Sequence, residues 1–161
     1  HETTAGAIAG GIDALSANRG QYGLLRSKPD LVAKAVEEIL RYVSPVPSFI
    51  RVAVNDYELR GRQIKAGQSV MMIYPSANRD EDVFEHPHVL DIERANNEHI
   101  AFGFGPHVCI GLALARLEMR HFFREFASRV EQIELTQPTT WVKTNFLGGP
   151  KSMKVKCTFG S

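Results

Sequence analysis

The feature that most constrains this chain is residues 101–111, AFGFGPHVCIG, in which glycines surround a single cysteine. The stretch runs directly into a segment with the spacing of an amphipathic helix, so Cys109 is expected at or near a helix N-terminus. There the free backbone N–H groups and the helix dipole favour a thiolate, the form of cysteine that ligates metals or acts as a nucleophile. Gly103 and Gly105 permit backbone conformations closed to other residues, and Gly111 lets a large flat group approach the helix start.

Phe102, Gly105, Cys109 and Gly111 are separated by two, three and one residues. This order resembles the cysteine-ligand loop of the cytochrome P450 haem-thiolate monooxygenases. The tail of the chain and residues 76–81 look most like the bacterial terpineol-hydroxylating members of that family, and the resemblance covers nearly the whole chain. Without it, a lone cysteine after a loop would be interpreted as buried and chemically inert, because free cysteine is among the most buried residue types.

The resemblance implies a cofactor, haem b (iron protoporphyrin IX), whose iron is bound by Cys109. It also implies that Arg51 and His107 bind the haem propionates, which agrees with the geometric match between a guanidinium and a carboxylate. An arginine on the face of a sheet is the alternative interpretation of Arg51. The remaining haem contacts implied by the resemblance are made by Ala101, Phe102, Gly103, Val108, Ile110, Gly111 and Ala115.

Residues 1–16 carry apolar residues at helical spacing, followed by a polar and glycine stop, so they are predicted to form a helix. In the family, an acid followed by a threonine lies in the helix that crosses the oxygen-binding face of the haem. The resemblance implies that Thr3 hydrogen-bonds dioxygen and that Glu2 helps to deliver protons, which makes both catalytic together with Cys109. Alternatively, Glu2 and Thr3 are polar residues at a frayed chain end.

Residues 31–43 are predicted to form an amphipathic helix with Asp30 as its N-cap. Glu38 and Arg41 are three residues apart and therefore share one face of that helix. On their own they would form a surface ion pair that contributes little stability. The resemblance implies that they join Arg94 in a buried network, structural rather than catalytic, that ties the helix to the cysteine loop.

The middle and the end of the chain are predicted to contain short strands. Strand-like runs lie at 51–54, 57–60, 63–64, 69–74, 132–135, 141–142 and 152–158. The turn residues between the first four are typical of a small antiparallel meander. The resemblance implies that the substrate pocket is lined by Val46, Ser48, Phe49, Phe146 and Leu147.

The expected fold class is mainly α with small antiparallel β-sheets (α+β), the C-terminal portion of the cytochrome P450 fold. A long helix is predicted from about residue 111 to 130. Its Arg116 and Arg120 are candidates for contact with an acidic electron donor, but for each arginine singly the pattern favours a charge on a solvated helix face. Residues 1–161 are expected to be the C-terminal haem-binding part of one larger domain. The missing N-terminal part of the same protein is then an expected partner.

Composition sets weaker limits. A formal net charge of +1 indicates no nucleic acid or other polyanionic partner. Two cysteines make no disulfide framework, which favours a reducing, cytoplasmic location. No apolar run is long enough to span a bilayer, and no signal peptide is visible.

The resemblance implies a monooxygenase that hydroxylates a small apolar, terpenoid-like substrate with O2, using electrons from a ferredoxin fed by a NAD(P)H reductase. One alternative is a truncated, non-catalytic haem-binding or ligand-sensing protein. The other is a zinc site formed by Cys109 with nearby histidines, which are His86, His88, His99 and His107. The chain has no Cys-x-x-Cys pair, and Cys157 is far away in the sequence, so the pattern speaks against zinc.

Overall fold

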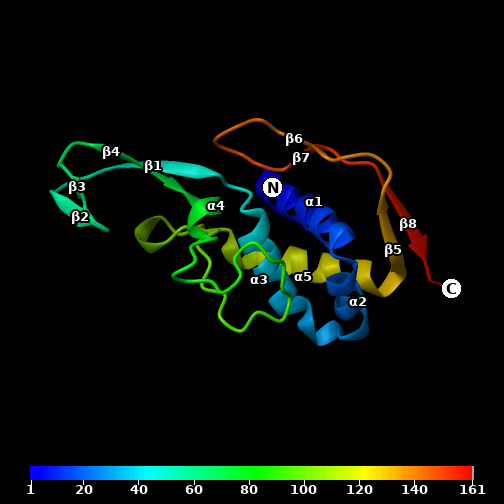
Figure 1. Cartoon of the computed structure of the whole chain (residues 1–161). Helices are drawn as coiled ribbons and strands as arrows, with labels where there is room; N and C mark the ends of the chain where they lie inside the picture. Colours follow the sequence, from blue (N-terminus) through cyan, green and yellow to red (C-terminus); the bar gives the residue numbers. More distant parts are fainter. Residues whose placement is uncertain (161) are drawn as a thin grey trace.

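Helices form where apolar residues recur at helical spacing, and four of them pack together at the centre of the molecule (Figure 1). The computed structural model describes residues 1–160. Its α-helices are α1 (Glu2–Ala17), α2 (Arg19–Ser27), α3 (Val32–Val43), α4 (Tyr74–Ala77) and α5 (Leu112–Arg129), with 3-10 turns at Pro29–Leu31 and Gly105–His107. The predicted helices at the start of the chain, after residue 31 and after residue 111 are therefore present.

Glycines let α1 lie unusually close to its neighbours. A Cβ atom added to Gly11 would come within 2.7 Å of the Phe123 ring on α5 and 2.8 Å of Ile39 on α3. A Cβ atom added to Gly10 would lie 2.6 Å from Val43. Because backbone that lacks a Cβ atom can approach side chains directly, α1, α3 and α5 share one core.

The predicted N-cap at Asp30 is wrong. Asp30 lies inside the 3-10 turn Pro29–Leu31, and this turn runs straight into α3. Leu31, which precedes α3, has helical dihedrals (φ −73°, ψ −11°), whereas a capping residue normally has an extended backbone. Proline at the first position of the turn starts the helical geometry early, so no side chain caps α3.

The strands form four two-stranded antiparallel sheets, so the predicted meander is wrong. The strands are β1 (Ser48–Val52), β2 (Tyr57–Leu59), β3 (Arg62–Ile64), β4 (Ser69–Ile73), β5 (Val130–Leu135), β6 (Thr140–Trp141), β7 (Pro150–Ser152) and β8 (Val155–Phe159). β1 pairs with β4, and the β2–β3 hairpin is inserted between them. Arg60 and Gly61 both have positive φ, which closes that hairpin tightly, while Ala53 bonds to Gln68 and extends the β1–β4 pair.

The C-terminal strands also differ from the expectation. The single strand predicted at 152–158 is divided between β7, which pairs with β6, and β8, which pairs with β5. The backbone of Lys154 separates them, since its carbonyl accepts the Thr136 N–H. β5 and β8 lie beside the helices, while β6 and β7 pass over α1 (Figure 1).

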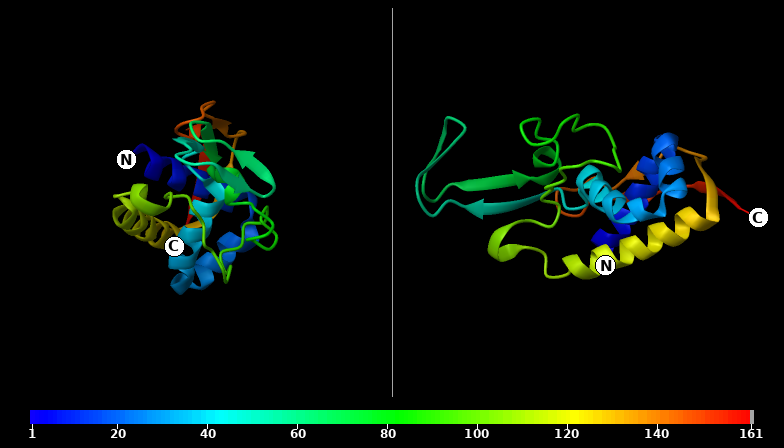
Figure 2. Two further views of the ribbon diagram at one scale, coloured as in Figure 1. Left: turned by 90° about the vertical axis from the view of Figure 1, so that its left-hand side faces the viewer. Right: turned by 90° about the horizontal axis from the view of Figure 1, so that it is seen from below.

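Two regions flank the helical core. The β1–β4 ribbon and its β2–β3 tip project beyond the helices as an arm (Figure 2). Residues 78–104 form no helix or strand, yet they are anchored in the core by Phe84, Leu90, Ile92 and Ala101. This long ordered segment leads the chain from the arm back to Cys109 and the start of α5.

Candidate functional site

A cavity of about 270 Å³ brings together the beginning of α1, the end of α3 and the cysteine loop. It is lined by His1, Thr3, Thr4, Ala7, Leu40, Pro45, Val46, Ala101, Phe102, Cys109, Gly111, Leu114, Ala115, Glu118 and Met119. Seven of these are predicted site residues: Thr3, Val46, Ala101, Phe102, Cys109, Gly111 and Ala115. Thr3 and Cys109, which are more than a hundred positions apart in the sequence, therefore line the same cavity.

The backbone around Cys109 is held by a set of tight turns. Its N–H donates to the carbonyl of Phe102 at 2.9 Å, and its own carbonyl accepts the N–H of Leu112, the first residue of α5, at 3.2 Å. Gly103 and Gly105 have φ of +76° and +73°, which only glycine adopts without strain. Cys109 therefore lies three residues before α5, and it is exposed, so the interpretation as a buried inert cysteine does not describe it.

The two residues expected to bind propionates lie outside this cavity. Arg51 is exposed on β1, where its guanidinium donates to the carbonyl of Ile50 at 3.0 Å and lies 5.7 Å from the centre of the Phe49 ring. His107 is exposed in the 3-10 turn before the cysteine. Both side chains are accessible to an anionic group, and their propionate roles stay predictions.

Three further predicted haem contacts also lie outside the cavity. Gly103 closes the turn between Phe102 and the cysteine, and a Cβ atom there would lie 3.6 Å from the carbonyl of His107. Val108 and Ile110 flank Cys109 and are exposed, Ile110 completely. Apolar side chains on both sides of an exposed cysteine leave an uncovered apolar surface around the sulfur atom.

Glu2 and Thr3 face different spaces. Thr3 lines the cavity that contains Cys109, whereas Glu2 lines a second cavity together with Ala5, Leu147 and Gly149. Adjacent residues on a helix point about 100° apart, and here Glu2 is directed to the second cavity while Thr3 lines the first. The structure does not bring this predicted pair together.

The predicted substrate residues do not share one wall of the cavity. The Phe49 and Phe146 rings meet edge to face with centroids 6.0 Å apart, and the Ser48 hydroxyl donates to the carbonyl of Asn145 at 2.9 Å. Val46 lines the cavity of Cys109, and Leu147 lines the second cavity. These contacts tie residues 145–147 to β1.

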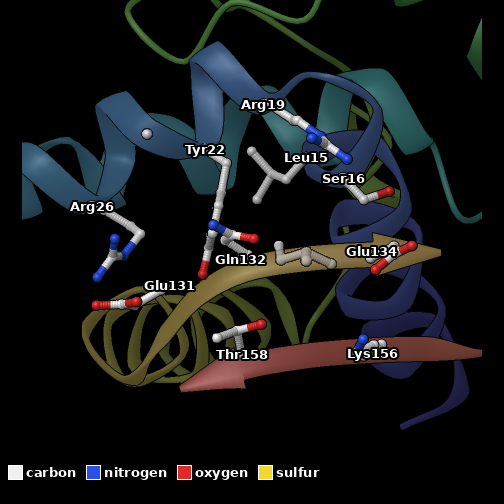
Figure 3. Close-up of a pocket in the computed structure, with 12 residues that line it drawn as sticks. Leu15, Ser16, Arg19, Tyr22, Arg26, Glu131, Gln132, Glu134, Lys156 and Thr158 are labelled. Carbon is white, nitrogen blue, oxygen red and sulfur yellow. The ribbon is translucent and has the colours of Figure 1, made fainter. Parts of the chain in front are cut away.

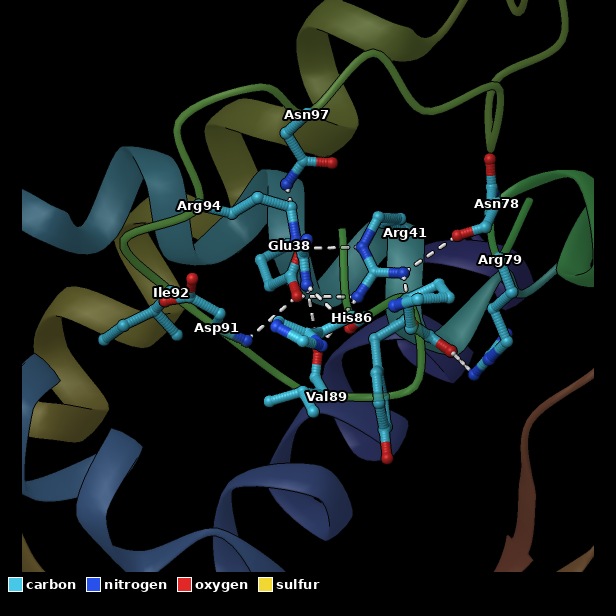
Figure 4. A network of polar contacts seen from close by, with 12 residues as sticks. Glu38, Arg41, Asn78, Arg79, His86, Val89, Asp91, Ile92, Arg94 and Asn97 are labelled. Carbon is cyan, nitrogen blue, oxygen red and sulfur yellow. Dashed lines mark hydrogen bonds and ion pairs between the residues drawn. The ribbon is translucent and has the colours of Figure 1, made fainter. Parts of the chain in front are cut away.

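Glu38, which is fully buried together with Arg41, lies at the centre of a polar network (Figure 4). Its carboxylate accepts two bonds from Arg41, at 2.7 and 2.8 Å, and one from Arg94 Nε at 3.1 Å. The backbone N–H of Asp91 and the amide of Asn97 complete its coordination at 2.9 and 3.0 Å. The structure thus brings the three predicted members together. The arginines also bond to backbone carbonyls of the 78–104 segment, namely those of Asn78, Glu85, His86, Pro87 and Val89.

Glu37, which the sequence analysis missed, organises a second cluster. Its carboxylate accepts bonds from Arg116 Nε at 2.9 and 3.0 Å and from Arg116 Nη2 at 2.8 Å. His99 Nε2 lies 3.1 Å away and Arg120 Nη2 3.4 Å away. Arg116 and Arg120 are therefore paired within the chain, but their side chains stay 29% and 43% exposed, so their contact with an electron donor stays a prediction. Their four-residue spacing on one helical face was visible in the sequence, but their partner was not.

Another cavity, of about 240 Å³, lies between α1 and α2 on one side and β5 and β8 on the other (Figure 3). Charged and polar side chains such as Arg19, Arg26 and Glu134 line it, and the Tyr22 hydroxyl beside them donates to the carbonyl of Val130. Burial raises the pKa of Tyr22 to about 12. Every residue that lines this cavity lies outside the predicted site.

The histidines do not form a metal site. Within residues 1–160, no three His, Cys, Asp or Glu side chains are placed to hold a metal ion together, which speaks against zinc. His99 is engaged with Glu37, and His86 is exposed.

Across residues 1–160, no helix combines the length and the apolar character that crossing a membrane requires.

The cavity beside Cys109 fits a large flat ligand with a metal at its centre. Its lining is mainly apolar, and the thiol opens onto it. A Cβ atom added to Gly111 would meet only the sulfur of Cys109, at 3.9 Å, so this end of α5 is open. An exposed thiol, an apolar lining and an open helix start are what thiolate ligation of haem requires.

The chain belongs to the cytochrome P450 family, whose family model matches residues 25–157. It is 46% identical over 158 residues to cytochrome P450-terp of a Pseudomonas species, covering 98% of this chain and 37% of that protein. It is 37% identical over 155 residues to linalool 8-monooxygenase of Pseudomonas putida, covering 96% and 38%. The resemblance, including that to terpene-acting members, is confirmed.

Solved structures agree with this assignment. CYP108D1 of Novosphingobium aromaticivorans superposes with a TM-score of 0.91 at 38% identity, covering 99% of this chain and 39% of that one. The structure of P450BioI in complex with an acyl carrier protein superposes with a TM-score of 0.93 at 35% identity, covering 98% and 41%. The predicted fold class is confirmed, and the chain spans about two fifths of the length of these relatives.

Proposed function

We propose that this chain is the haem-ligating part of a monooxygenase that hydroxylates a small apolar substrate with O2. The observation that supports this most directly is that the exposed Cys109 thiol and Thr3 line the same cavity. The proposed reaction needs the metal ligand and the proton-handling hydroxyl at one site. Membership of the cytochrome P450 family supports haem as the cofactor, and we propose haem b. Residues 1–161 would then be the C-terminal part of one larger domain, completed by an N-terminal part.

In this proposal each residue has a defined task. Cys109 would hold the iron as a thiolate, and Ala101, Phe102, Gly111 and Ala115, which line the same cavity, would contact the haem. When bound, haem supplies oxygen activation, which a thiolate ligand promotes by donating electron density. The remaining haem contacts are Gly103, Val108 and Ile110, with Arg51 and His107 bonding to the propionates.

Thr3 and Glu2 would handle protons, Thr3 from the wall of the cavity that contains Cys109. The Thr3 hydroxyl can donate one hydrogen bond and accept two, which suits a proton relay between solvent and the cavity. Glu2 lines the neighbouring cavity, so we propose that it supplies protons from there rather than by direct contact. Cys109, Thr3 and Glu2 remain the proposed catalytic residues.

Apolar, terpenoid-like molecules are the proposed substrates. Relatives at 37–46% identity include cytochrome P450-terp and linalool 8-monooxygenase, while others are named for steroid oxidation and polyketide biosynthesis. Val46, Ser48, Phe49, Phe146 and Leu147 are the proposed substrate contacts. We further propose a ferredoxin-type donor fed by a NAD(P)H reductase, and a cytoplasmic location.

A hemin titration tests the proposal. The chain should bind hemin, and the reduced carbon monoxide complex should show the red-shifted Soret band of thiolate ligation. Cys109→Ser should lose that band, because a hydroxyl is a far weaker ligand, whereas Cys157→Ser is the matched control and should retain it. A well-folded chain that refuses hemin would contradict the proposal. Binding without hydroxylation, when an N-terminal part and a ferredoxin system are supplied, would favour the ligand-sensing alternative.

A further inference from the structure

Two neighbouring glutamates on α3 point to different parts of the molecule. Glu38 contacts Asp91 and Arg94 in the middle of the 78–104 segment, whereas Glu37 contacts α5 and His99, two residues before the cysteine loop. We propose that Glu37 is a positioning residue: it holds the Cys109 loop in its ligating conformation through Arg116 and His99. The haem part of this inference rests on the proposed function, whereas the conformational part does not.

The first set of contacts between Glu37 and the cysteine loop runs through Arg116. Glu37 accepts three close contacts from its guanidinium, between 2.8 and 3.0 Å, in the forked geometry that orients an arginine firmly. The same guanidinium carbon lies 4.9 Å from the centre of the Phe102 ring, within the range of a cation–π contact. The carbonyl of Phe102 in turn accepts the N–H of Cys109 at 2.9 Å. A chain of direct contacts therefore connects Glu37 to the cysteine backbone.

The second set of contacts runs through His99, whose side chain is only 2% exposed. Its Nδ1 accepts the backbone N–H of Ala101 at 3.2 Å, so the ring proton must reside on Nε2. That Nε2–H then donates to Glu37 at 3.1 Å. Because both ring nitrogens are engaged, the imidazole is fixed in one tautomer and orientation, and it fixes the residue that begins the cysteine loop.

Charge explains why the carboxylate is needed. Burial by itself raises the pKa of Glu37, but bonds from His99 and Arg116 outweigh it and lower the pKa to about 2. Glu37 is thus ionised at neutral pH and balances Arg116 and Arg120, which lie four residues apart on α5. Without it, two like charges would face each other at that spacing, which is unfavourable in a helix. Arg116 would then leave the Phe102 ring.

The test compares Glu37→Gln with Glu125→Gln in the full 161-residue chain. Glu125 forms an exposed ion pair with Arg129 on the same helix α5, so it controls for the loss of one carboxylate. Amide hydrogen exchange reports on the loop without haem. In Glu37→Gln the amides of Ala101 and Cys109 should exchange about tenfold faster relative to the core amide of Ile39, and the affinity for hemin should fall about tenfold, as expected for a residue that orients a ligand.

Each outcome decides the proposal. Unchanged exchange at Cys109, or an equal acceleration at Ile39, would overturn the positioning role, because a general loss of stability moves all amides together. If the wild-type chain fails to bind hemin, the proposed function fails while the exchange comparison still stands. If Glu37→Gln does not fold, Arg116→Lys replaces it. Lysine keeps the charge but loses the fork and the flat stacking, so Cys109 should again exchange faster, and wild-type exchange would contradict the proposal.

Discussion

The networks around Glu38 and Glu37 are adjacent in sequence but differ in burial and in what they hold. Glu38 and Arg41 are fully buried, and their partners fasten the long irregular segment to α3 (Figure 4). The Glu37 side chain is 23% exposed, and its partners are His99, just before the cysteine loop, and Arg116 and Arg120 on α5. Burial makes the first network costly to break, whereas the second is partly open to solvent. Two consecutive residues of α3 thus serve different regions, Glu38 the long irregular segment and Glu37 the surroundings of the cysteine loop.

The largest expected effect is that of Glu38→Ala. It leaves the buried guanidinium of Arg41 without its carboxylate, and breaking a buried pair by removing one partner costs about 3–5 kcal/mol. Urea denaturation followed by circular dichroism measures the loss in the free energy of unfolding. A loss as small as that of an exposed ion pair would show that the two networks do not differ in the way that their burial indicates.

Acid titration tests the Glu37 network, and the expected effect is smaller than that of Glu38→Ala. The pKa of Glu37 is lowered from its usual 4.5 to about 2 in the folded chain. A carboxyl whose pKa is lowered by folding contributes stability above its unfolded pKa, and this contribution disappears as the pH falls through the folded pKa. The difference in the free energy of unfolding between wild type and Glu37→Gln should therefore shrink between about pH 4.5 and pH 2. A difference that stays constant across this window would contradict the ionised, hydrogen-bonded carboxylate.

The smallest expected effect is that of Glu125→Gln. Glu125 and Arg129 are exposed and form an (i, i+4) pair with an N–O distance of 2.7 Å. Such a pair contributes about 0.3–0.5 kcal/mol, because solvent screens it and its side chains lose entropy. Thermal unfolding should place this variant close to the wild type. A larger loss would mean that exposed pairs on α5 matter more than the Glu37 comparison assumes.

Local patterns predicted the helices and the order of the cysteine loop because both depend on residues close together in the chain. Gly103 and Gly105 adopt positive φ, a backbone conformation that favours glycine, so these glycines in the sequence indicated tight turns. Strand pairing was predicted less well, since β1 could have paired with β2 or with β4, and only the tight Arg60-Gly61 turn and the bonds of Ala53 select β4.

In the candidate site, too, single residues could be predicted from the sequence, whereas their contacts could not. The sequence named Cys109 and Thr3, but an adjacent Glu2 looked equivalent until the helix direction assigned it to another cavity. Arg116 looked like a free surface charge because the sequence contains no mark of its partner. Its pairing with Glu37 joins residues 79 positions apart, and such a contact depends on how α3 and α5 pack.

The sequence by itself determined the family, the cysteine and the spacing of Glu38 with Arg41, because these are matters of residue type and short separation. The tertiary structure alone decided which side chains share the cavity and which carboxylate serves which arginine. Those choices arise when α1, α3 and α5 are brought into contact around Gly10 and Gly11, since burial and charge balance exist only between surfaces that have already met.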